Sequence, residues 1–215
     1  MKRIFLYVLG CFGLMAFGQV AFNDQGGWIS LFDGKTLEGW KVGDNAATFH
    51  VDSAMIIVHG NTAHLFYDGA VKHHQFKNFE FKADVMTMPG ANSGIYFHTE
   101  FQQGGWPKKG YEVQVNNSHT DWRRTGSLYA VKDVKEVYVK DREWFTEYFK
   151  VQGKHVIIQL NGKTVVDYTE PADVLRERAG GDSLRVISSG TFALQGHDPN
   201  SLVYFRNIMV RPLPE

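Results

Sequence analysis

The sequence predicts an all-β fold in which two antiparallel sheets pack face to face as a sandwich. Three observations lead to this class: short runs of alternating apolar and polar side chains, turn signals between these runs, and very little that could form a helix. Residues 79–85 alternate most clearly, with Phe, Phe, Ala and Val at odd positions and Glu, Lys and Asp at even ones. Such a pattern buries one face of a strand.

In chain order, the same criterion predicts strands at residues 28–32, 49–58, 79–87, 94–99, 111–115, 148–152, 155–160, 164–168, 191–195 and 202–211. Asn161-Gly162 lies between two of them and predicts a two-residue hairpin turn, because both residues tolerate positive φ. One short helix is expected at 172–179, ended by Gly180-Gly181. The strand at 28–32 could pair with the strand at 202–211 and bring the two ends of the domain together.

The charges balance. The 215 residues contain 23 Lys and Arg against 23 Asp and Glu, with a formal net charge of zero and a pI near 7.1. Nucleic acid is therefore not an expected partner, because binding it requires a basic surface. No linker, repeat or low-complexity stretch divides the chain, so we expect residues 19–215 to form a single domain.

Residues 1–18 have the pattern of a secretory signal peptide, with Lys2 and Arg3 before an apolar run over 4–17 and small residues up to Gly18. The run is shorter than the roughly 20 apolar residues of a membrane-spanning helix, so we expect no stable membrane insertion. We expect export to the periplasm or the exterior, with a lipoprotein anchored through Cys11 as the alternative. Cleavage after Gly18 removes the one cysteine, which excludes disulfides and thiolate chemistry.

Seven segments, in order along the chain, are similar to the motifs of one family. They are 31–40 (LFDGKTLEGW), 78–81 (NFEF), 92–97 (NSGIYF), 111–115 (YEVQV), 126–129 (GSLY), 160–162 (LNG), and 190–195 followed by 205–208. On these motifs the chain resembles the 3-keto-disaccharide hydrolase domain family from about residue 28 to residue 212. The resemblance implies a concanavalin A-like lectin/glucanase sandwich, a jelly roll whose concave sheet carries the site. It also implies action on sugars oxidised at the 3-position, and bacterial export.

Polar side chains gather on one face of two predicted strands. Period two places Glu112 and Gln114 opposite the apolar side chains of their strand, and Tyr96 and His98 in the same way on the preceding strand. We expect these four residues to share the concave face. A solvated sheet face is the alternative, but Tyr, His, Glu and Gln are more typical of the lining of a polar binding site.

Further candidates flank this face. Gln195 ends one strand, the loop after it contains His197, and the Asn92-Ser93 turn could present amide groups to sugar hydroxyls. Trp106 and Trp122 lie in polar loops and could stack on a pyranose ring. The set expected to bind substrate is Tyr96, Gln114, Tyr129, Gln195, Asn92, Ser93, Trp106 and Trp122.

The number of carboxyl groups points to the chemistry. Ordinary glycosidases need two carboxyls across the scissile bond, whereas residues 112–117 carry amides where the glucanases of the implied fold have the second and third acids of Glu-x-Asp-x-x-Glu. A ketone at C3 acidifies the C2 proton, so β-elimination needs only one base, one acid and a group that stabilises the enolate. We assign Glu112 as base or proton shuttle, His98 or His197 as acid, and Gln114, Tyr129 and Gln195 as orienting groups.

The sequence shows no required cofactor, although His98, Glu112 and His197 could instead hold a divalent metal that stabilises the enolate. Two other functions stay open. A glycan-binding module on the same sandwich would need no base. A conventional glycosidase would need a second carboxyl from a loop, for which Glu100, Asp121 and Asp133 are the candidates.

Overall fold

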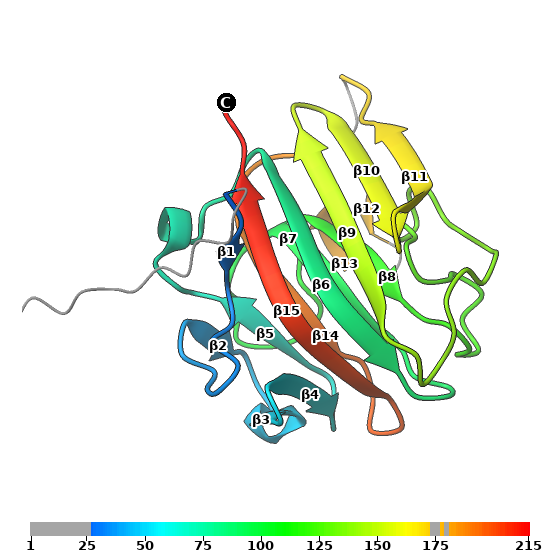
Figure 1. Cartoon of the computed structure of the whole chain (residues 1–215). Helices are drawn as coiled ribbons and strands as arrows, with labels where there is room; N and C mark the ends of the chain where they lie inside the picture. Colours follow the sequence, from blue (N-terminus) through cyan, green and yellow to red (C-terminus); the bar gives the residue numbers. More distant parts are fainter. Residues whose placement is uncertain (1–26, 173–176, 179–180) are drawn as a thin grey trace, which may run out of the picture.

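The computed structural model describes residues 27–172, 177–178 and 181–215. In this part of the chain two antiparallel sheets form the expected sandwich (Figure 1). An eight-stranded sheet has the order β11-β10-β9-β6-β15-β4-β3, with β1 also paired to β15, and a five-stranded sheet has the order β2-β5-β14-β7-β8. The expected signal peptide at 1–18, which includes Cys11, lies outside the described residues.

The larger sheet consists of β1 (Ile29–Ser30), β3 (Phe49–Asp52), β4 (Met55–His59), β6 (Phe79–Thr87), β9 (Phe145–Gln152), β10 (His155–Leu160), β11 (Lys163–Thr169) and β15 (Leu202–Pro212). The smaller sheet consists of β2 (Trp40–Val42), β5 (Ala63–Tyr67), β7 (Ser93–Thr99), β8 (Tyr111–Val115) and β14 (Thr191–Gly196). A separate hairpin joins β12 (Glu177–Arg178) to β13 (Gly181–Leu184), and two short 3-10 helices occupy Ala46–Thr48 and Val71–His74.

Two sequence predictions about pairing are confirmed. The turn between β10 and β11 has positive φ at Asn161 (49°) and Gly162 (81°), as its sequence requires. The first described strand pairs with the last, with Ile29 opposite Val210. Figure 1 shows β1 beside β15.

Two predictions about elements are wrong. The strand expected at 49–58 is divided into β3 and β4, because Ser53 and Ala54 both adopt positive φ and reverse the chain. The helix expected at 172–179 is contradicted at Glu177–Arg178, which pair with β13 instead. Residues 173–176 and 179 of that expected helix lie outside the described part of the chain.

The core between the sheets is aromatic. Phe192 of β14 contacts Phe79 and Phe81 of β6 at ring-centroid distances of 4.9 and 4.7 Å, and Phe149 of β9 stacks on Phe81 at 4.7 Å. All four are fully buried. Because side chains alternate along a strand, an inward-facing Phe192 turns its neighbours on β14 towards the opposite face of the smaller sheet.

That opposite face, which we call the outer face of the smaller sheet, has a small apolar cluster of its own, formed by Phe66, Tyr96 and Ala193. Its polar residues are also largely shielded from water: Glu112 is 5% exposed and Gln114 is 1% exposed. The outer face is therefore not the solvated face that the sequence left open as an alternative. Among the described residues no helix is long and apolar enough to cross a membrane.

Candidate active site

The carboxylate of Glu112 is held at the centre of the outer face by two donors. The Tyr96 hydroxyl donates to its Oε2 at 2.9 Å, and Gln195 Nε2 donates to its Oε1 at 2.8 Å. Tyr96 lies on the neighbouring strand β7, directly opposite Glu112 in the register, and Gln195 comes from β14. The fold thus brings together three residues that the sequence assigned to the site, and fixes the orientation of the expected base.

Gly94 explains how Glu112 can reach Gln195 across the intervening strand β7. A Cβ at Gly94 would lie 2.9 Å from Glu112 Cγ and 3.0 Å from its Cδ, and closer still to Oε1. The carboxylate therefore occupies the space above this glycine. The glycine motif Asn-Ser-Gly is required here for close approach of a side chain rather than for a turn.

Gln114 and Asn92 form a second polar pair beside Glu112. Gln114 Nε2 donates to Asn92 Oδ1 at 2.8 Å. Among the described residues, Gln114 Oε1 and Gln195 Oε1 are buried and accept no hydrogen bond. Buried acceptors without a donor are costly, so these two amide oxygens are suited to receive hydroxyl groups of a ligand.

His197 forms a pair with the adjacent Asp198. Its Nδ1 lies 2.7 Å from Asp198 Oδ2, which also accepts the Ser201 hydroxyl at 2.8 Å. Burial alone would raise the pKa of Asp198, but hydrogen bonds from His197, Ser201 and the backbone N–H of Asn200 outweigh it and lower that pKa. Asp198 is therefore an ionised acceptor that fixes Nδ1–H of His197 and leaves its Nε2 available for proton transfer.

Ring contacts connect His197 to the centre of the site. The Trp106 ring lies 5.5 Å from His197 and 5.5 Å from His64, and His64 lies 5.4 Å from Tyr96. Trp106 is 44% exposed. An exposed indole beside the expected acid can stack on the apolar face of a ligand.

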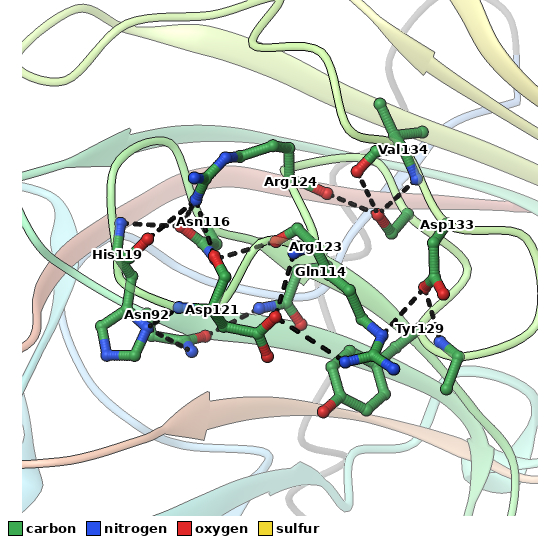
Figure 2. Close-up of polar contacts among 12 residues, drawn as sticks. Asn92, Gln114, Asn116, His119, Asp121, Arg123, Arg124, Tyr129, Asp133 and Val134 are labelled. Carbon is green, nitrogen blue, oxygen red and sulfur yellow. Dashed lines mark hydrogen bonds and ion pairs between the residues drawn. The ribbon is translucent and has the colours of Figure 1, made fainter.

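The loop after β8 supplies a network around Arg123 (Figure 2). The guanidinium forms ion pairs with Asp133 at 3.3 Å and Asp121 at 3.7 Å. It also lies 4.7 Å from the centroids of both the Trp122 and the Tyr129 rings. Tyr129 donates its backbone N–H to Glu112 O at 3.0 Å, which anchors this loop to the site strand.

His98 is not on the outer face, and its assignment there is wrong. It has positive φ (54°) at a bulge where the pairing of β14 with β7 shifts register, which turns its ring into the core against Phe79 at 5.6 Å. Nε2 bonds to Lys77 O at 3.0 Å, and Nδ1 accepts from Ser188 N at 3.1 Å. Burial lowers its pKa to about 4. A neutral imidazole with both nitrogens engaged is a structural residue, not an acid.

Four other candidates have structural partners. Ser93 is fully buried and donates its hydroxyl to Gln195 O at 2.6 Å, so it joins β7 to β14 rather than reaching a ligand. The carboxyls considered for a conventional glycosidase are ion-paired as well, Glu100 with Lys109 at 3.4 Å and the two aspartates with Arg123.

The expected metal ligands do not form one group, since His98 is in the core. Within the described residues, the group with metal-ligand geometry is instead His119, His197 and Asp198, whose ligand atoms lie within 4.8 Å of one another. Sequence reasoning missed His119 and His64. No signal pointed to His64, because residues 63–67 (Ala-His-Leu-Phe-Tyr) do not alternate between apolar and polar side chains. His119 lies in a loop, where no periodicity indicates direction.

The sequence matches one family model. Residues 27–211 match the 3-keto-alpha-glucoside-1,2-lyase-like domain. A protein named 3-keto-disaccharide hydrolase, from Bacteroides thetaiotaomicron, is 25% identical over 238 residues, which cover 88% of this chain and 80% of that protein.

Solved structures share the architecture. A Parabacteroides distasonis protein, provisionally classed as a glycosyl hydrolase, has a TM-score of 0.73 at 22% identity, covering 87% of this chain and 94% of its own. The carbohydrate-binding module CBM66 of Bacillus subtilis has a TM-score of 0.57 at 12% identity, covering 80% and 95%. At these identities the likeness establishes the fold.

Proposed function

The chain belongs to the family of 3-keto-alpha-glucoside-1,2-lyase-like domains, and from that membership we propose that it is an exported carbohydrate-active enzyme that cleaves the glycosidic bond of 3-keto-glycosides or 3-keto-disaccharides. The observation that carries the proposal is the Glu112 carboxylate, nearly buried and held by Tyr96 and Gln195. Export rests on the sequence of residues 1–18, with lipid attachment at Cys11 as the alternative.

Glu112 acts as the base. It removes the proton from C2 of the 3-keto sugar, and the electron pair of that C–H bond forms the C2=C3 bond of an enolate while the C3 oxygen takes the negative charge. Both carboxylate oxygens accept hydrogen bonds, so the side chain is oriented before the substrate arrives.

His197 acts as the acid. When the enolate pair returns to form C1=C2, the C1–O bond breaks and the leaving oxygen takes a proton from His197 Nε2. Asp198 stabilises the imidazolium and holds its orientation through Nδ1. Addition of water across C1=C2 then gives the free 3-keto sugar, so that the overall reaction is hydrolysis.

The remaining residues orient the sugar. The amide oxygens of Gln114 and Gln195 accept hydroxyl groups, and Trp106 stacks on a pyranose face. Tyr129 and Trp122 lie with Arg123 at the side of the site formed by the loop after β8, where they extend the contact surface for the leaving group.

The test uses the mature protein from residue 19 with chromogenic α- and β-glucosides and their 3-keto derivatives. We expect release of the chromophore from a keto form only, and slower release when C2 carries deuterium, because proton abstraction at C2 is part of the mechanism. Glu112→Gln should lower kcat by about 10²–10⁴-fold. Glu143→Gln, an exposed carboxyl ion-paired to Lys140, is the matched control and should keep the wild-type rate.

A glycan-binding module is the second candidate, because CBM66 has the same architecture. It requires the buried amide acceptors and exposed indoles but no base. Binding of glycosides without turnover of any keto derivative would favour it, and an unchanged rate in Glu112→Gln would remove Glu112 from the reaction.

A further inference from the structure

The ring of His119 is fixed by a network that determines which nitrogen bears its proton. Nδ1 lies 3.1 Å from the backbone N of Asp121, which donates to it, and 3.3 Å from Nδ2 of Asn92 (Figure 2). The backbone of His119 is fixed as well, since its N–H donates to Asn116 Oδ1 at 2.9 Å and Arg124 donates to its carbonyl oxygen at 2.8 Å.

Both groups facing Nδ1 are donors. A backbone N–H can only donate, and the amide of Asn92 presents its NH₂ to His119 because Gln114 Nε2 donates to its Oδ1 at 2.8 Å. Nδ1 is therefore an acceptor, and in the neutral imidazole the proton lies on Nε2. Among the hydrogen bonds of the described residues, none uses Nε2 of His119, so this N–H is available to a ligand.

The neighbouring His197 has the opposite arrangement. Its Nδ1–H is directed at Asp198, which leaves Nε2 as the nitrogen that exchanges a proton. The two rings are 5.5 Å apart, and a nitrogen of each lies within 4.8 Å of the other. The site thus contains two adjacent imidazoles, one fixed as a hydrogen-bond donor and one fixed as a proton carrier.

The same tautomer argues against a metal at this cluster. Nδ1 of His119 is occupied by two donors, so a metal could only be bound through Nε2. A neutral imidazole that binds a metal through Nε2 bears its proton on Nδ1, and that proton would point at the N–H groups of Asp121 and Asn92. The donor arrangement is favourable for a hydrogen bond and unfavourable for a metal ligand.

We propose that His119 Nε2–H donates a hydrogen bond to the C3 oxygen of the keto sugar and stabilises the negative charge that develops there when Glu112 removes the C2 proton. The inference rests on the proposed function. A neutral imidazole suits this task because it remains a hydrogen-bond donor as the oxygen becomes negative. It is too weak an acid to protonate the enolate before the C1–O bond breaks. His119 is then a catalytic residue in contact with the substrate, whereas Asn92 is a positioning residue that acts through it.

Two substitutions separate this role from a structural one. In His119→Asn the side-chain oxygen can take the place of Nδ1 and accept from Asp121, but no donor remains at the position of Nε2. In His119→Gln the longer amide can place an N–H near the position of Nε2, while the acceptor at Nδ1 is lost. We expect kcat of His119→Asn on the 3-keto-glucoside to fall by about 10²–10³-fold with a smaller change in KM, and His119→Gln to recover part of that loss.

The outcomes are distinct. The role of His119 is overturned if His119→Asn keeps the wild-type kcat, or if kcat is lower in His119→Gln than in His119→Asn. In either case, cleavage of the keto sugar by the wild type still supports the proposed function. Dialysis of the wild type against a chelator should leave the rate unchanged. Loss of activity that a divalent cation restores would overturn the donor role in favour of a metal centre. A wild type that cleaves no keto sugar refutes the proposed function and this role with it.

Discussion

Replacing Gly94 by alanine tests the position of the base without changing any group that takes part in the reaction. Gly94 does not have a positive φ, so alanine fits the backbone, and its effect comes from the contact with Glu112. The added Cβ would lie 2.9 Å from Glu112 Cγ and 3.0 Å from its Cδ, whereas ordinary contacts begin at 3.4 Å. The carboxylate must therefore move, by on the order of 0.5 Å at these atoms and more at Oε1.

A displacement of that size weakens the hydrogen bond from Gln195, which is 2.8 Å long in the wild type, and misaligns the base with the C2 proton. A misplacement of about 1 Å costs roughly 10²-fold in rate, or about 2.7 kcal/mol of transition-state stabilisation. We expect kcat/KM of Gly94→Ala on the 3-keto-glucoside to fall by about that factor, measured by steady-state release of the chromophore.

Gly90→Ala is the matched control. Its Cβ would meet nothing within 4 Å, but its φ of 78° is strained for alanine, so we expect lower thermal stability with unchanged kcat. If Gly94→Ala kept the wild-type kcat/KM with its melting temperature also unchanged, the assignment of Glu112 in this geometry as the base would be wrong.

Two buried titratable groups make further predictions, with opposite signs. Burial raises the pKa of Glu147 well above its usual value, so the folded state holds a proton that the unfolded state releases above about pH 4.3, and stability falls as pH rises through this range by at most about 1.4 kcal/mol per pH unit. In urea unfolding, the free energy of unfolding of Glu147→Gln relative to that of the wild type should therefore be higher at pH 7.5 than at pH 5. Equal differences at the two pH values would contradict the buried proton. Burial lowers the pKa of His98 to about 4, so the unfolded state binds a proton below about pH 6.5 that the folded state rejects, and stability falls as pH drops from 6.5 towards 4. The free energy of unfolding of His98→Gln should depend less steeply on pH in that window. A slope as steep as that of the wild type would refute the neutral imidazole.

The sequence could predict the strands that have one apolar face, because alternation reports burial on a single side. It predicted β6, with Phe79 and Phe81 inward, and the tight turn at Asn161-Gly162. It could not predict β5, because Leu65, Phe66 and Tyr67 follow one another without a polar side chain between them. Strands β8 and β14 of the same sheet are buried just as fully, but their sequences alternate, and they were predicted.

For the site, the sequence predicted correctly which side chains lie together wherever a strand is regular and its side chains alternate between the two faces. Glu112, Tyr96 and Gln195 meet because each lies in a regular part of its strand. The prediction for His98 was wrong because a single extra residue in β7 reverses the direction of the side chain, and the sequence carries no sign of that bulge. His119 was missed because its role depends on a hydrogen bond from the backbone of Asp121, which no residue pattern encodes.

The position of β15 in the larger sheet has a consequence for the order of folding. This strand, at residues 202–212, is hydrogen-bonded to β6 on one side and to β4 and β1 on the other. Strands from the first half of the domain therefore have no partner along one edge until the last strand is available. Pairs so distant in sequence close slowly, so the larger sheet cannot be completed from its early strands as the chain emerges. Completion waits for the C-terminal strand, and the unpaired edges of β4 and β6 are where an incomplete chain would associate with others.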